Sequence, residues 1–587
     1  MSNNGTAIAS RTKPTDLVTI KILLNGRPIS GEYKITGLDI STGFNKISSA
    51  RITIADGDPA RQEFAISSKE DGLKPGADIE ISLGYHADTK TVFKGIIIRH
   101  AIKSGKNKPS FLTIEAKDKA IKLALTRNNR CFSEMTDTDI IKAVIGKSAY
   151  NGNVEIGATG LSHKEMVQYN ALDWDFIVCR AEMNGMLVLA AENKLVINAP
   201  DTSKSPTKEL TYGIDIIEFE SELDAVSQID HVTSLSWSYK DQKVEESGEA
   251  SISFKENGNL NGKALASALG LNQYQLVHPG NLNAEELKSW SESALLKSRL
   301  AKNIGHIKVQ GTTEIIPGNV IGLKGFSDRF NGNVLVTAIS HSYYGSVWET
   351  DIQFGLPARF FYKHEEIVEK PASGLVPGVN GLQIGVVLQN ESDPEQQDRV
   401  KVRLPLVDAS EGLWARMASL DAGKDRGSFF RPEINDEVIV GFLNDDPRYP
   451  VILGMLNSSS SPAPLKGSDD NHEKGFVTRS KMKFVFNDDK KSITIDTPKG
   501  KKVEINDDGD SMTFSDQHNN KIILDSKGIT LESGKDVSIK AAAGNISMNG
   551  INVEAKANAK FSAEGSANAS LQSSGPTIVK GAIVNIN

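Results

Sequence analysis

Few residues of this chain have the type and spacing of a catalytic or ligand-binding site. Gly146-Lys147-Ser148 ends like a phosphate-binding loop, but Ile141 stands where such a loop requires its first glycine. His364-Glu365-Glu366 and His472-Glu473-Lys474 begin like zinc-protease motifs, yet the fifth position of each is apolar and cannot bind zinc. We therefore predict neither a nucleotide site nor a zinc site, and we expect both histidine motifs to be solvated.

The acidic clusters are equally incomplete. Asp393, Glu395 and Asp398 could supply a glycosidase pair, but we interpret them as a polar hairpin loop. The run Asn506–Asp510 resembles part of a calcium loop, although Gln517 stands where that loop needs a glutamate. We therefore predict no catalytic residue, no cofactor and no metal, and we do not expect an enzyme.

Composition indicates a large globular protein. The chain has 587 residues, of which 39% are hydrophobic and 24% charged, and this length suits about four domains. The net charge of −7 argues against a nucleic-acid binder, and no apolar run is long enough to span a membrane. Met1–Asp16 lacks the apolar core of a signal peptide, and Cys131 and Cys179 are too few for a disulfide framework. We expect synthesis in the cytoplasm without a signal peptide, and two cysteines that are small buried side chains.

The elements that would position these residues are mostly strands. Alternating runs predict early strands at Leu17–Leu24, Ala50–Ile54, Ala77–Leu83, Val92–Ile98 and Phe111–Ala116. Apolar stripes predict helices at Asp137–Lys147, Ala171–Met183 and Ala284–Lys302. Thr136 is the expected cap of the first helix, and Asn25-Gly26 and Asp56-Gly57 are expected turns. Further strands are predicted at Met186–Val188, Lys194–Ile197, Ile307–Thr312, Val320–Leu323, Val334–Tyr343 and Trp348–Phe354.

A compact unit follows a Pro- and Gly-containing linker. Its five predicted strands fit a small Greek-key barrel of the OB type. These strands are Gln383–Leu388, Arg399–Leu404, Leu413–Met417, Glu437–Phe442 and Pro450–Gly454. A Ser/Pro-rich stretch at 458–468 then separates this unit from the last part of the chain.

The last part of the chain alternates apolar and polar residues, strand after strand. The apolar pairs are Phe484/Phe486, Ile493/Ile495, Val503/Ile505, Met512/Phe514, Ile522/Leu524, Ile529/Leu531, Val537/Ile539, Ile546/Met548 and Ile551/Val553. Beyond them the alternation continues with small residues, as in Ala555, Ala557 and Ala559. Methyl groups in one chain cannot offset about 1–2 kcal/mol of backbone ordering per residue. The segment is therefore either disordered or wound together with other copies, and the persistent alternation favours the second interpretation.

Several sequence blocks resemble the VgrG spike proteins. The OB unit contains the matching blocks Gly385-Val386-Val387, Asp393-Pro394, Asp398–Pro405, Leu413–Ala418, Phe430–Phe442 and Asp446–Gly454. Upstream, Ala171–Phe176 with Arg180-Ala181-Glu182 resembles a helix of the family's tail-hub domain. Downstream, Gly528–Ile539 is similar to its β-needle repeats.

This resemblance implies a mainly β homotrimer that acts as the central spike of a contractile injection system. The expected order is a tail-hub-like region over 1–365 with two β-barrel subdomains and inserted helices, a linker over 366–381, an OB-fold collar over 382–457, a linker over 458–475, and a trimeric intertwined β-helix or prism with its tip over 476–587. The implied partners are inner-tube (Hcp-like) and baseplate proteins, a PAAR-like tip protein, effector cargo and, transiently, the target membrane. Type VI secretion and an extracellular phage-tail-like particle both remain open.

The tip is the one site that we predict. Gly581, Ala582, Ile583, Val584, Asn585, Ile586 and Asn587 form a short apolar-ended strand that we expect to dock the PAAR-like cap. The stretch Asn457–Lys474 is too short for the lysozyme domain that some relatives insert, and no toxin is expected beyond the needle. The alternatives are a cell-wall-degrading needle enzyme and a trimeric receptor-binding tail fibre.

Overall fold

The computed structural model describes residues 17–106, 108–364, 367, 369–408 and 410–586. The chain divides into two compact units, which we call the first unit (1–381 with 442–449) and the second unit (382–441 with 450–587). The predicted mainly β fold class is confirmed. Among the described residues, no helix is long and apolar enough to cross a membrane.

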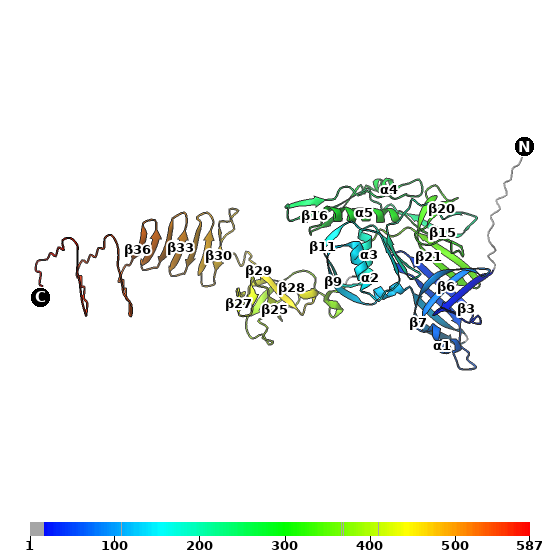
Figure 1. Ribbon diagram of the computed structural model, residues 1–587, viewed down its shortest axis with the longest axis horizontal. Helices are drawn as coiled ribbons and strands as arrows, with labels where there is room; N and C mark the ends of the chain where they lie inside the picture. The colour runs from blue at the N-terminus through cyan, green and yellow to red at the C-terminus, as the bar shows by residue number, and fades with distance from the viewer. Residues whose placement is uncertain (1–16, 107, 365–366, 368, 409, 587) are drawn as a thin grey trace. The chain divides into compact units, whose positions relative to one another are not determined.

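One sheet of thirteen strands dominates the first unit, where we expected two barrels. Its main path runs β15-β19-β22-β21-β3-β5-β8-β7-β6-β1-β2, and β20 and β14 extend from β21 (Figure 1). The strands are β1 Val18–Leu24, β2 Arg27–Pro28, β3 Ile35–Gly43, β5 Ser49–Ala55, β6 Asp78–Tyr85, β7 Asp88–Gly105, β8 Lys108–Lys117, β14 Lys208–Thr211, β15 Ile216–Leu223, β19 Asn303–Gln310, β20 Val320–Lys324, β21 Gly332–Tyr344 and β22 Val347–Phe354. The two halves join because β3 pairs with β21.

Alternation explains why these runs form strands. In β5, Ile52 and Ile54 point into the core and are almost fully buried, while Arg51 is exposed. Asn25 and Gly26 have positive φ values of 48° and 81°, which suits the tight turn predicted between β1 and β2. Asp56-Gly57 does not close a hairpin, because β5 pairs with β3 and β8 while Asp56 accepts hydrogen bonds from the amides of Ile66 and Ser67.

Three helices occur where the apolar stripes predicted them. They are α2 Asp137–Gly146, α3 Asp173–Met183 and α5 Ala284–Leu300. The side chain of Thr136 accepts a hydrogen bond from the amide of Asp139, which confirms the cap. Helix α3 begins later than predicted because Leu172 is extended and ends a strand. The remaining elements here are α1 Ala65–Lys69, α4 Gly262–Ala268, β4 Lys46–Ile47, β9 Arg127–Thr136, β10 Asn153–Ile156, β11 Ser162–Leu172, β12 Leu187–Ala191, β13 Lys194–Asn198, β16 His231–Ser238, β17 Lys243–Glu246 and β18 Gln273–His278.

The predicted OB-type unit is a closed five-stranded barrel in the order β23-β24-β25-β29-β28. Its strands are β23 Gln383–Gln389, β24 Val400–Arg403, β25 Leu413–Met417, β28 Glu437–Phe442 and β29 Pro450–Met455, with a small hairpin of β26 Ala422–Gly423 and β27 Arg426–Gly427. Buried Val387, Val402 and Val440 contribute to its interior.

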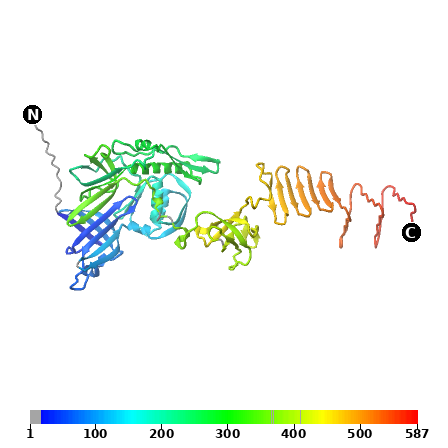
Figure 2. The same cartoon turned by 180° about the vertical axis from the view of Figure 1, so that it is seen from behind.

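Seven antiparallel strands then form a sheet that we call the ladder (Figures 1 and 2). They are β30 Glu473–Val477, β31 Lys483–Asn487, β32 Ser492–Asp496, β33 Lys502–Asn506, β34 Ser511–Ser515, β35 Lys521–Asp525 and β36 Gly528–Glu532. We expected the hydrogen-bonding neighbours of these strands on other chains. They lie in the same chain instead, because short turns return each strand antiparallel to the one before it.

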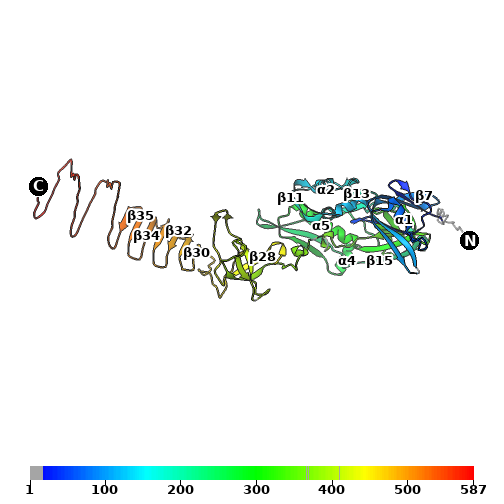
Figure 3. The same ribbon diagram turned by 90° about the horizontal axis from the view of Figure 1, so that it is seen from below.

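The described residues 533–586, which we call the tail, contain no assigned strand (Figure 3). The pairs Val537/Ile539, Ile546/Met548 and Ile551/Val553 are therefore not strands within this single chain, contrary to the prediction. A strand needs a hydrogen-bonded neighbour. In the tail, unlike in the ladder, no short turn folds the chain back to pair with the segment before it.

Candidate functional site

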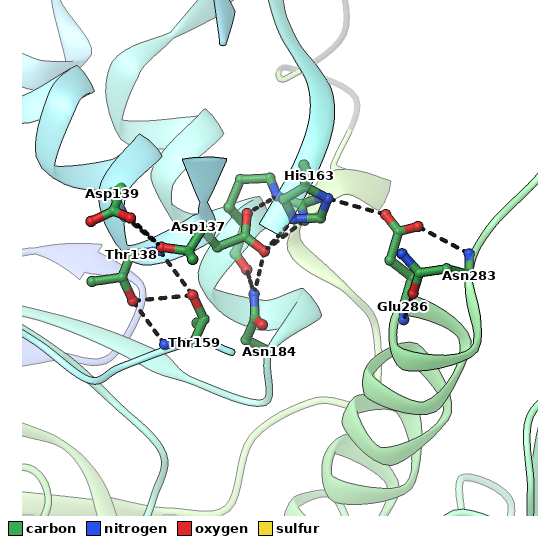
Figure 4. Close-up of polar contacts among 10 residues, drawn as sticks. Asp137, Thr138, Asp139, Thr159, His163, Asn184, Asn283 and Glu286 are labelled. Carbon is green, nitrogen blue, oxygen red and sulfur yellow. Dashed lines mark hydrogen bonds and ion pairs between the residues drawn. The ribbon is translucent and has the colours of Figure 1, made fainter. Parts of the chain in front are cut away.

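A group of titratable side chains lies around His163 in the first unit (Figure 4). His163 on β11 places Nε2 at 2.9 Å from Asp137 Oδ2 and Nδ1 at 3.2 Å from Glu286 Oε1. Arg180 on α3 reaches the same aspartate, with Nε at 2.6 Å from Oδ1, and Asn184 Nδ2 donates to Oδ2 at 2.9 Å. Residues from β11, α2, α3 and α5 thus meet in one polar cluster, which we call the His163 cluster.

The protonation states of this cluster follow from its pairing. Hydrogen bonds to Asp137 and Glu286 outweigh the desolvation of His163 and raise its pKa to about 9. Burial alone would raise the pKa of Asp137, but hydrogen bonds from His163 and Arg180 hold it well below its usual range. At neutral pH the cluster is therefore an imidazolium and a guanidinium between two carboxylates.

Only the pair of His163 and Asp137 in this cluster resembles part of a catalytic triad. A general base must be unprotonated, and it must face the hydroxyl or thiol that it activates. Both ring nitrogens of His163 instead face carboxylates. Glu286 also accepts a hydrogen bond from the amide of Asn283 and completes the capping box of α5. The His163 cluster therefore joins four elements and holds α5 in place.

The block that resembles the tail-hub helix supplies similar buried pairs. Asp173 forms a two-pronged pair with Arg130, and Glu182 accepts from Lys297 Nζ at 2.6 Å. Glu182 also accepts from the amide of Phe361 at 2.7 Å. Removing one partner of such a pair would leave an uncompensated buried charge, so these residues hold the packing together.

The other residues whose types could support catalysis or metal binding lie apart from one another. Cys131 is exposed, contrary to expectation, whereas burial raises the pKa of Cys179 to about 12 and keeps its thiol protonated. Asp393 is paired with Arg399 at 2.6 Å in the predicted loop. Glu365, Glu366 and Val368 of one histidine motif lie outside the described residues. In the part of the chain that the structure describes, no group of three or more His, Cys, Asp or Glu residues could hold a metal ion.

The ladder carries a different kind of candidate site, an apolar surface that we call the ladder face. Strand pairing aligns its side chains in two rows, because directly paired residues lie on the same side of a sheet. The first row is Phe476, Phe484, Ile495, Val503, Phe514, Ile522 and Leu531, and the second is Phe486, Ile493, Ile505, Met512, Leu524 and Ile529.

The two sides of the ladder differ sharply in chemistry. On the ladder face, Met512 is 39% exposed, Phe514 43% and Ile529 76%. The central row of the opposite side is mixed, since polar Thr494, Glu504 and Thr513 lie between apolar Val485 and Ile523. Its margin is polar and mostly charged, as Lys483, Asp496, Lys502, Ser515, Lys521 and Glu532 pair in succession. A contiguous exposed apolar surface marks an interaction site.

Six of the seven predicted tip residues belong to the exposed tail. Gly581 to Ile586 have exposed side chains and no assigned strand, and Asn587 lies outside the described residues. Ile583 is 82% exposed and Ile586 90%. The predicted cap-docking role of Gly581, Ala582, Ile583, Val584, Asn585, Ile586 and Asn587 stays a prediction.

Three protein families match this chain. The family described as Alg8 N-terminal domain matches residues 14–344, which is more than half of the chain. The type VI secretion system/phage-baseplate injector OB domain matches residues 383–456, and the phage baseplate V C-terminal trimerisation domain matches residues 477–555. The last of these includes most of the ladder and the start of the tail.

Individual relatives cover less of the chain. The type VI secretion system spike protein VgrG1a of Pseudomonas aeruginosa is 33% identical over 113 residues, 18% of this chain and 18% of the relative. The actin cross-linking toxin VgrG1 of Vibrio cholerae is 33% identical over 96 residues, 15% of this chain and 9% of the relative. The chain therefore spans less than a fifth of the length of these curated relatives.

Among solved structures, the 43 kDa tail protein of prophage MuSo2 from Shewanella oneidensis is similar over 58% of this chain and 98% of that chain. Its sequence identity is 13% and the TM-score is 0.44. The sequence matches, in contrast, run in order along most of the chain. The chain therefore belongs to the Alg8 N-terminal domain family and continues into the injector OB domain and trimerisation domain of VgrG-type and phage-baseplate spike proteins.

Proposed function

We propose that three copies of this chain form the central spike of a contractile injection system. The ladder face carries this proposal, because most of the apolar side chains in its two rows are exposed in the described chain. The match to a trimerisation domain over residues 477–555 supports three as the number of copies. Three ladder faces turned toward a common axis would each remove apolar surface from water, worth roughly 25 cal/mol per Å².

The tail fits the same arrangement. Its alternating alanines bury too little surface to order one chain, but three copies would supply hydrogen-bonding neighbours for one another. The shift from Phe and Met in the ladder to Ala in the tail suits a shaft whose interior narrows. Such a shaft would resist unfolding while it is driven through a membrane.

We assign the remaining parts by the same proposal. Residues 1–365 form the hub that caps the inner tube and meets the baseplate, 366–381 and 458–475 are linkers, 382–457 is the collar, and 476–587 is the needle. The tip carries a PAAR-like cap, and effectors travel as separate cargo. The protein is made in the bacterial cytoplasm, joins an injection particle and leaves the cell with it. No catalytic step is part of this role, since the His163 cluster and the Asp393 loop are internal ion pairs.

Native mass spectrometry of the purified full chain tests the assembly. We expect a species of three times the 63.5 kDa chain, whose ladder and tail resist proteolysis. A well-folded monomer at micromolar concentration would refute the proposal.

The tip assignment needs its own experiment. Removing residues 581–587 should abolish co-purification of a PAAR-like cap protein while the trimer mass falls only by the deleted residues. A matched variant, Ile551→Ser in the tail, should retain the cap. Unchanged cap retention after the deletion would show that the cap binds elsewhere.

A further inference from the structure

The ladder is a meander, so its turns alternate between its two long edges (Figure 2). One edge, which we call the first edge, carries turns 478–482, 497–501 and 516–520. The other, which we call the second edge, carries turns 488–491, 507–510 and 526–527. The two edges lie at opposite ends of strands of five residues, roughly 17 Å apart.

The two edges differ in charge. On the first edge, turns 478–482 and 497–501 contain no carboxylate, and their four cations are Arg479, Lys481, Lys499 and Lys501. On the second edge, turn 507–510 contains no cation, and its three carboxylates are Asp507, Asp508 and Asp510. The neighbouring turn 488–491 contains two charges of each sign. The strongest contrast is therefore between turn 497–501 and turn 507–510.

Most charges of these two turns are not neutralised inside the chain. Lys499, Lys501, Asp507 and Asp510 are exposed, and none of these four side chains forms an ion pair with another described residue. Asp508 differs, since Lys491 Nζ lies 3.0 Å from its Oδ1. Two lysines on one edge and two aspartates on the other are thus free to meet another molecule.

Threefold symmetry would bring the two unlike edges together. In the proposed trimer, the three ladder faces turn toward an axis that runs along the stack of strands. Rotation about this axis places the first edge of each copy beside the second edge of the next copy, and never two like edges. A contact between unlike edges of this kind is heterologous, and it closes into a ring of three.

The turns of the two edges are offset by one strand along the stack. Turn 497–501 joins β32 to β33, and turn 507–510 joins β33 to β34. Their heights therefore differ by about 4.8 Å, the distance between paired strands. Because rotation about the axis preserves height, the turns of neighbouring copies would interleave at each corner. Turn 497–501 of one copy would then lie directly beside turn 507–510 of the next.

We propose that Lys499 and Lys501 of one copy pair with Asp507 and Asp510 of the next copy, at each corner of the trimeric ladder. This inference rests on the proposed three-copy spike and deepens it. The apolar ladder face brings the copies together, whereas the corner charges select which edges meet. A copy inserted upside down would bring two first edges together, and the repulsion between their lysines opposes that arrangement.

Charge reversal in the full chain tests this pairing. The first variant combines Lys499→Glu with Lys501→Glu, and the second combines Asp507→Lys with Asp510→Lys. Either variant places like charges at all three corners, so the trimer should be lost at a lower urea concentration, by roughly 0.5 M or more at low salt. The variant that carries all four substitutions restores opposite charges and should regain most of the lost resistance to urea.

Two controls isolate the electrostatic effect. Lys204→Glu with Lys240→Glu makes the same change of charge at exposed positions of the first unit and should not move the midpoint for trimer loss. In 1 M NaCl the screening length is about 3 Å, so the differences between the reversed variants and the original chain should largely disappear. Differences that persist unchanged in 1 M NaCl would contradict an ion-pair origin.

Zero-length cross-linking of the unsubstituted protein gives a second readout. A carbodiimide joins a carboxylate to a lysine amine that touches it, and peptide mapping identifies the two residues. Within one copy the two edges are roughly 17 Å apart, so an amide between turns 497–501 and 507–510 must join two copies. We expect this amide in the three-chain band of a denaturing gel.

The outcomes separate this inference from the proposed function. A native trimer whose urea resistance is insensitive to both reversals, or is not restored by combining them, overturns the corner pairing and leaves the trimeric spike standing. Cross-links confined to one edge also overturn the pairing. A native monomer of the unsubstituted chain refutes the trimeric spike and the corner pairing together.

Discussion

The first unit and the ladder are both β sheets, but they cover their apolar residues differently. In the first unit, Ile52 and Ile114 are 1% and 0% exposed, because other elements of the same chain pack on them. In the ladder, Ile505 is 36% exposed and Ile522 41%, although both sit in regular strands that are paired on both sides. Regular hydrogen bonding therefore does not by itself complete a fold.

The two regions differ in which of their apolar side chains, charges and backbone hydrogen-bonding groups find partners within one copy. The first unit closes its core and its buried charges internally, and what it leaves open is backbone at the two edges of its sheet. The ladder pairs the backbone of its inner strands but leaves apolar side chains exposed. If three copies assemble, the first unit should depend on assembly for little of its stability, and the ladder for much of it.

Met512→Asp should give the largest effect, because it places a carboxylate on the ladder face. In the proposed trimer three such groups would meet at the axis, and each would cost several kcal/mol without a partner. We expect loss of the trimer in native mass spectra at micromolar concentration, with thermal unfolding of the first unit unchanged.

The neighbouring residue supplies the control. Thr513 lies one position along β34 and so points to the opposite side of the ladder. Thr513→Asp should leave the trimer intact. If both variants remain trimeric, the ladder face is not the assembly surface.

Arg180→Ala tests the other region of the comparison, the first unit with its internally paired charges. It leaves the buried carboxylate of Asp137 without its guanidinium partner, which should cost about 3–5 kcal/mol of first-unit stability. Calorimetry should show a lower unfolding temperature for the first unit and an unchanged transition for the ladder. Arg51→Ala removes an exposed pair with Glu115 and should cost less than about 1 kcal/mol. Equal losses in the two variants would show that the His163 cluster contributes no more than a surface pair.

Sequence patterns anticipated the parts of the fold whose interactions are local. The stripe Ile140, Ile141, Val144 and Ile145 placed α2 because a helix brings these positions to one face. The alternation of the ladder residues likewise placed β31 to β36. Alternation could not tell whether a neighbouring strand belongs to the same chain, and so our expectation of neighbours on other chains was wrong for the ladder.

The parts that escaped prediction depend on residues far apart in the chain. Strand β3 contains Gly37 and Gly43, which weaken its strand signal, and its partner β21 lies about three hundred residues later. His163 has no spacing relation to Asp137 or Glu286, so nothing in the sequence marked that cluster. A lone histidine in a strand and a glutamate in a distant capping box are each too common to identify it.

The pH dependence of stability should also differ between the two regions. The folded-state pKa of His163, about 9, lies above its ordinary value of 6.5. Its stabilising contribution is therefore complete below pH 6.5 and is lost as pH rises through about 9, a change of roughly 3 kcal/mol. Urea unfolding at pH 6, 7.5 and 9.5 should show the first unit losing stability toward high pH.

Two variants identify the group responsible. His163→Gln should be less stable at pH 6 and should lack most of this slope. His278→Gln, at an exposed position, should keep the slope of the original chain. A slope that persists in His163→Gln would assign the pH dependence to another group.

Thr136→Ala should give the smallest effect and tests whether local interactions in the first unit act independently of assembly. Its hydroxyl accepts a hydrogen bond from the amide of Asp139 at the start of α2, and losing such a cap typically costs about 1 kcal/mol. Thr136→Ser keeps an acceptor oxygen at the same position and should retain most of the stability. Because α2 packs within the first unit, the trimer measured by native mass spectrometry should be unaffected. A loss of trimer in Thr136→Ala alone would mean that assembly depends on the first unit more strongly than its internally closed core indicates.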